Sequence, residues 1–89
     1  MEIKRKFIRF EPDENTYVLL NIQDEEIHSG LCLTESQGGC SAVFKNNPLY
    51  RAGEMVMVKV GKLDPTSAEI RWVSELDKDV VKVGFEFLT

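Results

Sequence analysis

The sequence has little of several features that would narrow its class at once. Its 89 residues include one histidine, one tryptophan, three prolines and two cysteines, Cys32 and Cys40. No apolar run approaches the roughly 20 residues that a membrane helix needs, and residues 1–4 lead into no signal peptide. We therefore expect a cytoplasmic protein without membrane association, whose two thiols stay reduced and pack as small apolar groups.

Motifs for catalysis or metal binding are also lacking. The sequence has no phosphate-binding loop, no dinucleotide fingerprint and no metalloprotease helix. Two cysteines and His28 cannot form a closed zinc site without help from carboxylates. Ser36 lies in no nucleophile elbow, and His28 would have to serve every base role. We expect no catalytic residue, no metal ligand and no cofactor, and therefore a binding protein instead of an enzyme.

No stretch shows helical periodicity over ten or more residues. Strand-length runs rich in aliphatic and aromatic residues recur between turn signals instead, and a chain of this length forms one domain. These runs predict an all-β barrel or sandwich with little or no helix. An antiparallel closed barrel of six strands would remove exposed strand edges. The six predicted strands are residues 17–22, 27–33, 41–44, 55–60, 68–73 and 80–88, with a turn at residues 24–26. In the loop of residues 45–54, we expect the apolar Leu49 and Tyr50 to pack against the core.

Three local patterns add detail to this prediction. Ala68, Ile70 and Trp72 alternate with polar residues, so we expect all three on one face. Trp72 is expected in the core, and the alternative is that its edge lines a site. Gly84 inside the last strand predicts a bulge or bend there. Residues 34–39 end in two glycines, and they predict a break between the second and third strands where backbone could approach a ligand closely. The alternative is that Ser-Gln-Gly-Gly, residues 36–39, forms only a tight turn.

A basic cluster precedes the strands. Four of the seven residues from 4 to 10 are cationic, although the whole chain has a formal charge of -4. Arg5 and Arg9 are the most informative pair, because the planar guanidinium fits phosphate oxygens and the O6/N7 edge of guanine. Pro12 marks a loop that separates a flexible arm, residues 1–11, from a barrel at residues 16–88. The cluster favours a small anionic ligand, and a solvated tail is the alternative.

Three segments, read together, resemble the PilZ domain family of bacterial cyclic di-GMP receptors. Arg5 and Arg9 match the family's Arg-x-x-x-Arg motif. Residues 34–39, Thr-Glu-Ser-Gln-Gly-Gly, stand about where the family has Asp/Asn-x-Ser-x-x-Gly. Residues 68–73 and 83–88 look like the last two strands of the family, which end in a Gly-x-x-Phe element. The resemblance spans nearly the whole chain.

This resemblance implies a six-stranded antiparallel barrel, of the split or Greek-key type, with the arginine segment as a flexible N-terminal loop. Arg5 and Arg9 would fold over cyclic di-GMP, and Lys4 would add diffuse attraction. Ser36 and Gly39 would meet the other edge of the nucleotide, with Thr34 at the family's Asp/Asn position. The implied function is a receptor or adaptor in which the ligand orders the arm and the domain signals to a protein partner.

Two departures from the family pattern motivate an alternative. Thr34 offers one neutral oxygen where Asp would accept two hydrogen bonds, and this loss weakens binding by about a factor of ten. The chain also ends after its last strand, where many family members continue into a helix that covers the barrel. The alternative is a PilZ-like interaction module that has lost nucleotide binding and contacts a protein partner or a second copy.

A third possibility is a small barrel that binds single-stranded nucleic acid, with Phe7 and Phe10 stacking on bases. The acidic net charge disfavours this class, because backbone phosphates require a basic surface. We therefore expect no nucleic-acid partner.

Overall fold

The computed structural model describes residues 9–10, 16–22 and 27–88, and for Arg9 and Phe10 it describes the backbone only. No helix occurs among these residues, so none that could span a membrane occurs there either. The seven strands are β1 (Arg9–Phe10), β2 (Tyr17–Asn21), β3 (Ile27–Ser36), β4 (Gly39–Lys45), β5 (Met55–Val60), β6 (Thr66–Asp77) and β7 (Val80–Phe87).

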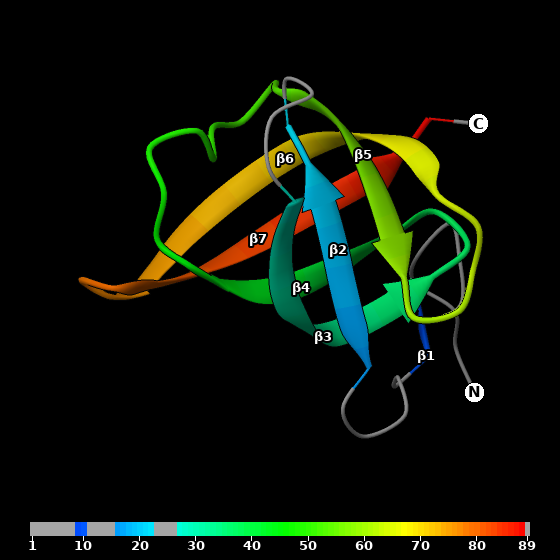
Figure 1. The fold of residues 1–89 in the computed structure, drawn as a ribbon, viewed down its shortest axis with the longest axis horizontal. Helices are drawn as coiled ribbons and strands as arrows, with labels where there is room; N and C mark the ends of the chain where they lie inside the picture. Colours follow the sequence, from blue (N-terminus) through cyan, green and yellow to red (C-terminus); the bar gives the residue numbers. More distant parts are fainter. Residues whose placement is uncertain (1–8, 11–15, 23–26, 89) are drawn as a thin grey trace.

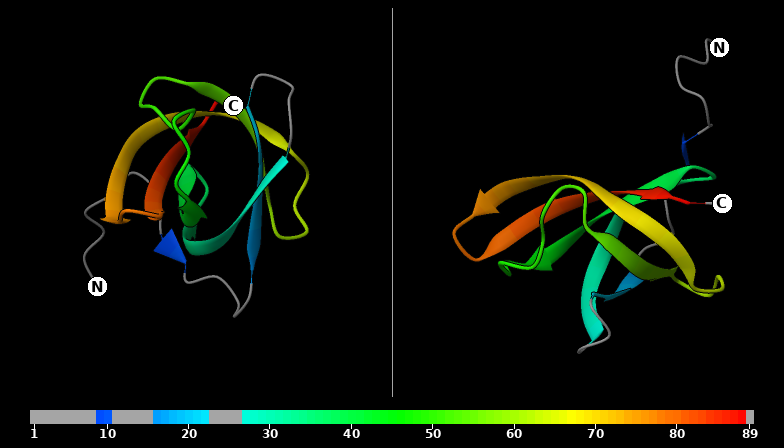
Figure 2. Two further views of the ribbon diagram at one scale, coloured as in Figure 1. Left: turned by 60° about the vertical axis from the view of Figure 1, so that its left-hand side comes forward. Right: turned by 90° about the horizontal axis from the view of Figure 1, so that it is seen from above.

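Strands β2 to β7 form a closed antiparallel barrel (Figure 1). Their order around the barrel is β3-β2-β5-β6-β7-β4, and pairing between β3 and β4 closes the ring. β1 pairs with the last residues of β3, outside this ring. Figure 2 shows the strands wrapping around a common interior. The structure confirms the prediction of a six-stranded barrel and decides against a sandwich.

Alternate residues of all six barrel strands fill the interior. Tyr50, from the loop between β4 and β5, is buried with them, and its ring lies 5.4 Å from that of Phe44. Phe44 also meets Phe85 edge to face, with ring centroids 6.0 Å apart. The largest fully buried side chains are Phe44, Leu20, Ile22, Ile70, Val18, Val58, Val81 and Val83.

The prediction that residues 34–39 break the sheet was wrong for residues 34–36 and for Gly39. β3 continues through Ser36 and β4 begins at Gly39, so only residues 37–38 form the turn. The reason is that the end of β3 is paired on both sides: Glu35 lies opposite Cys40 of β4 and opposite Phe10 of β1. The turn expected at residues 24–26 lies outside the described residues.

The prediction that Trp72 shares the core face of Ala68 and Ile70 was also wrong. Ala68 and Ile70 are fully buried, but Trp72 is 42% exposed. The register between β6 and β7 shifts between Ile70 and Trp72, so Arg71 is an extra residue in β6. One extra residue reverses the alternation of faces, and the indole turns outward. The bulge expected in the last strand at Gly84 therefore lies in the strand opposite it.

Candidate functional site

A groove of about 330 Å³ lies on the outer surface, where the β3–β4 turn meets β6 and β7. It gathers three of the residues that the sequence predicts for ligand binding: Thr34, Ser36 and Gly39. Its lining consists of Thr34, Glu35, Ser36, Gly38, Gly39, Cys40, Ser41, Arg71, Trp72, Lys82, Gly84, Phe85 and Glu86.

The β3–β4 turn forms one wall, and Ser36 fixes its shape. The Ser36 Oγ accepts a hydrogen bond from the Gly38 N–H at 3.2 Å and donates one to the Gly39 carbonyl at 3.3 Å. A Cβ at Gly39 would overlap the carbonyl oxygen of Phe85, so only glycine lets β4 approach β7 this closely. The Ser-x-x-Gly spacing thus has a structural role in the turn, besides any contact with a ligand.

Thr34 and Ser41 supply neutral polar groups to the same wall. The two residues lie opposite each other in β3 and β4, after a register shift that follows Cys32. Their hydroxyl oxygens are 2.7 Å apart, so one hydroxyl donates to the other. Ser41 is only 5% exposed, and Thr34 is half-buried. Each hydroxyl can both donate and accept, so this pair can meet either type of ligand group.

Trp72 and Gly84 form the opposite wall. A Cβ at Gly84 would overlap the indole atoms Cε2, Nε1 and Cζ2, so the ring rests in the space that glycine leaves open. Lys82 Nζ lies 5.7 Å from the centroid of the ring, which is a cation–π distance. The exposed part of the indole offers a flat apolar surface, and such surfaces stack on nucleic-acid bases without regard to base identity.

The charges of the groove are nearly balanced. Arg71 Nη1 lies 3.6 Å from Glu69 Oε1 and 3.5 Å from Glu86 Oε1. These pairs contribute little stability, because the Arg71 side chain is 54% exposed, but they hold the guanidinium at the rim. Lys82 is the second lining cation and Glu35 the second lining anion. A multiply charged anion therefore needs cations from outside the lining.

Arg9 and Phe10, the described end of the basic segment, pair as β1 with the end of β3 beside this groove. The backbone of Arg9 pairs with Ser36, and that of Phe10 pairs with Glu35. Arg5 and Lys4 lie outside the described residues, as do the contacts of the Arg9 side chain. Of the predicted site, the structure brings together the Arg9 backbone, Thr34, Ser36 and Gly39.

Sequence reasoning considered only the edge of Trp72 for a site and missed the rest of the wall formed by β6 and β7, which contributes Arg71, Lys82, Gly84 and Glu86. Gly84 was the available signal, since a glycine in a strand marks a bulge or a close approach. Both occur here, with the bulge at Arg71 in the neighbouring strand and Trp72 as the group that approaches.

The two cysteines carry no reactive thiolate. Burial raises the pKa of the Cys40 thiol to about 12 and that of Cys32 to about 11. Both thiols are therefore protonated at neutral pH, and a protonated thiol is a poor nucleophile and a poor metal ligand. Within residues 16–22 and 27–88, no three His, Cys, Asp or Glu side chains gather as a metal site would require.

Comparison with known proteins gives structural similarity alone. No family model matches the chain, and no curated protein matches it. Among solved structures, the Bacillus subtilis inhibitor of motility (MotI/DgrA) aligns with a TM-score of 0.75 at 19% identity, over 99% of this chain and 44% of that one. The PilZ domain of Escherichia coli YcgR with c-di-GMP aligns with a TM-score of 0.69 at 16% identity, over 98% and 79%.

A longer YcgR structure from Escherichia coli, in complex with c-di-GMP, aligns over 97% of this chain and 38% of that one, with a TM-score of 0.70 at 18% identity. The chain thus spans less than half of the MotI/DgrA chain and of this longer YcgR chain. At these identities the similarity shows the fold, and the barrel is PilZ-like.

Proposed function

We propose that this domain is a receptor for cyclic di-GMP, which binds in the groove beneath the basic segment of residues 4–9. The observation that carries the proposal is the backbone pairing of Arg9, the last cation of the basic segment, with Ser36, which lines the groove. The fold supports it, because one of the similar barrels is a PilZ domain with c-di-GMP.

The groups around the groove fit the chemistry of this ligand. Cyclic di-GMP has two phosphates and two guanine bases. The lining is nearly neutral, so Arg5, Arg9 and Lys4 would provide the charge for the phosphates, with the two arginines also able to read guanine. Trp72 would stack on a base. At about 330 Å³ the groove is at the small end of ligand sites, so the arm would complete the enclosure.

Binding would also supply the signal. The arginines contact the ligand only when the arm lies over the groove, so the ligand stabilises that arrangement. The outer surface next to β1 and β3 then changes, and a protein partner that reads this surface distinguishes the two states.

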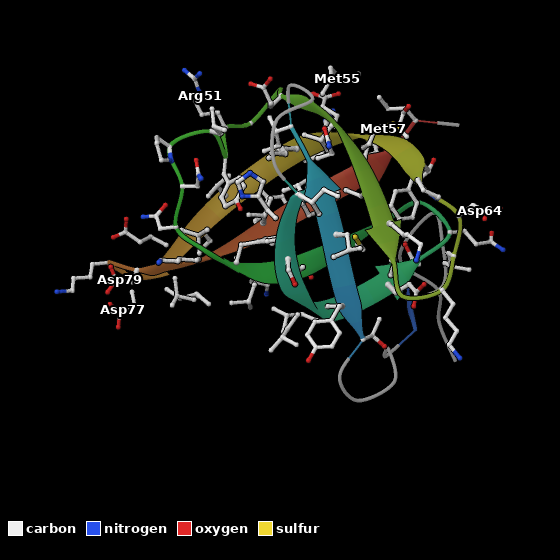
Figure 3. All side chains as sticks on the ribbon, viewed as in Figure 1. Arg51, Met55, Met57, Asp64, Asp77 and Asp79 are labelled. Atoms are coloured by element: carbon white, nitrogen blue, oxygen red, sulfur yellow. The ribbon has the colours of Figure 1, made fainter. Side chains whose placement is uncertain are left out.

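Calorimetric titration with cyclic di-GMP, using GTP as the control ligand, tests the proposal. We expect saturable binding, and a loss of at least tenfold in affinity for Arg5→Ala and for Arg9→Ala. Arg51→Ala is the matched control, because it removes the same charge from an exposed loop residue that does not line the groove (Figure 3). Thr34→Asp should raise the affinity by about tenfold, because a charged acceptor replaces a neutral one.

Two results would refute the proposal: no binding heat for the wild type, or unchanged affinity in both arginine variants while their far-ultraviolet spectra stay native. The proposal also requires that Arg51→Ala lower the affinity for cyclic di-GMP less than Arg9→Ala does. Equal losses of affinity would indicate long-range electrostatic attraction instead of a binding site.

A protein-interaction module without nucleotide binding is the second candidate. Two observations favour it: the Thr34 hydroxyl is already paired with Ser41, and the outer face of β2, β3 and β5 exposes large apolar side chains. Figure 3 shows Met55 and Met57 on β5. The exposed members of this face are Tyr17, Leu19, Ile27, Leu31, Leu33, Met55 and Met57. Absence of nucleotide binding in the titration would select this candidate.

A further inference from the structure

Among the described residues, no strand pairs with one edge of residues 71–77, the second half of β6 and here called the free segment. β5 reaches along β6 only as far as the pair Met55 and Glu69, followed by the hydrogen bond from the Gly53 N–H to the Ile70 carbonyl at 2.7 Å. Beyond Ile70, β7 is the only strand paired with β6 in the part of the chain that the structure describes. Figures 1 and 2 show the β6–β7 hairpin projecting past the rest of the barrel.

Both faces of this free segment are solvated as well. Every residue from 71 to 77 is exposed, including the apolar side chains of Trp72, Val73 and Leu76. A strand with one unpaired edge and exposed apolar side chains is a template for another strand.

The backbone groups that face the open edge follow from the alternation along the strand. Ile70 directs its N–H and C=O towards the β5 side. Without the extra residue, Trp72 and Ser74 would do the same. Because Arg71 shifts the alternation by one, Val73 and Glu75 present their N–H and C=O groups at the open edge.

The free segment is complementary to itself. When two copies run antiparallel with Ser74 opposite Ser74, Trp72 meets Leu76 and Val73 meets Glu75 of the second copy. Arg71 then lies opposite Asp77, so a cation faces a carboxylate at each end. The two extra residues of β6, Arg71 and Leu76, lie three positions before and two positions after Ser74, so a bulge bounds the segment near each end.

The two neighbouring registers of this antiparallel pairing are less favourable. An axis at Glu75 sets two carboxylates directly opposite each other, which is destabilising. An axis at Val73 brings the second copy's Leu76 and Asp77 beside Ile70 and Glu69, where β5 already occupies the edge. With the axis at Ser74, the two copies pair over residues 71–77, and neither copy reaches the residues that pair with β5.

We propose that the domain self-associates by antiparallel pairing of two β6 edges across a two-fold axis at Ser74. The pairing is isologous and continues the sheet from one barrel into the next. Val73 and Glu75 of each copy exchange four backbone hydrogen bonds in total. The contact is short because the bulges bound it, so we expect a dissociation constant that is micromolar or weaker. The proposal does not depend on nucleotide binding.

Sedimentation equilibrium of the nucleotide-free domain over a wide concentration range tests it first. We expect a monomer–dimer equilibrium, and a dissociation constant at least tenfold larger for Val73→Pro, because proline removes an N–H that faces the open edge and that β7 does not use. Val73→Thr keeps that N–H and the β-branched shape, so it is the matched control and should dimerise like the wild type.

Disulfide trapping is a second test that does not rely on the proline variant folding. In the proposed register the two Ser74 residues form a non-hydrogen-bonded pair, whose Cα separation of about 4.5 Å suits a disulfide. Ser74→Cys should therefore give an intermolecular crosslink under mild oxidation, while Lys78→Cys, in the turn between β6 and β7, should not. Wild-type protein controls for Cys32 and Cys40.

A strictly monomeric wild type up to millimolar concentration overturns the proposal. So does a dimer that Val73→Pro leaves unchanged while that variant retains native circular dichroism. Crosslinking of Lys78→Cys as fast as that of Ser74→Cys overturns the register.

Discussion

Replacing Gly84 with alanine tests the central feature of the groove, which is the packing of the Trp72 indole against Gly84 of β7. The new Cβ would overlap three atoms of the indole, and the ring is not the far end of a flexible chain but a rigid plane held by β6. The indole ring therefore has to move away from residue 84. We expect the groove to lose its aromatic wall while the barrel stays folded.

The size of the effect follows from the area that the ring covers. Trp72 is 42% exposed, so more than half of its surface is in contact with protein. Losing about 80 Å² of that contact costs about 2 kcal/mol at 25 cal/mol per Å². Alanine recovers about 0.5–1 kcal/mol, because it loses less backbone entropy than glycine on folding. The net loss is about 1–1.5 kcal/mol, which lowers the melting temperature by about 5 °C or more in a domain of this size.

Fluorescence reports the movement directly, because Trp72 is the only tryptophan. We expect the emission of native Gly84→Ala to shift to the red, together with the lower melting temperature. Gly53→Ala is the control: Gly53 has a φ of 93° and open space around its Cβ position, so alanine strains the backbone without touching the indole. It should lower stability and leave the emission unchanged. Native emission and unchanged stability in Gly84→Ala would refute the packing of Trp72 against Gly84.

Two further predictions concern the interior. Gly30→Ala should lower the free energy of unfolding by about 1–3 kcal/mol in urea titrations, because its Cβ would lie 2.6 Å from Phe44 Cε1 and from the Val43 carbonyl oxygen; an unchanged midpoint would contradict this packing. Burial raises the pKa of Cys40 from 9.0 to about 12, so the unfolded state ionises first and stability falls as pH rises from about 9 towards 12. Cys40→Ala should make this fall shallower, and an equal slope in wild type and variant would show that the thiol is not responsible.

The barrel could be predicted because its signals are local. Each of the six barrel strands contains an alternating or continuous apolar run between polar turns, and a short all-antiparallel chain has few ways to bury all of them. The loop residue Tyr50 was expected against the core for the same reason, and it is buried there. The ends of the strands were less predictable, since Thr34 and Ser36 are polar yet paired as strand on account of partners elsewhere in the chain.

The candidate site could be predicted only in part. One wall follows from a short local stretch of sequence, and the other depends on the register between strands. Thr34, Ser36 and Gly39 lie within one hairpin, so their proximity is visible in a short stretch of sequence. The facing wall depends on the exact register of β6 against β7, and on the register of β7 against β4, which at the groove pairs distant residues such as Gly39 and Glu86. No local pattern fixes such a register to one residue, and a shift of one residue exchanges the faces.

The extra residue in β6 shows how much depends on a register shift of one residue. Because Arg71 is inserted, Trp72 turns outward onto Gly84 and the guanidinium of Arg71 reaches Glu86 at the rim. The same insertion reverses the alternation beyond it, and this reversal brings Val73 and Glu75 to the open edge. A regular strand would have placed the indole with Ile70 on the core face, as the alternation in the sequence suggests, and would have left the groove without its aromatic wall. One residue of register therefore separates a plain barrel from one with both a walled groove and a self-complementary edge.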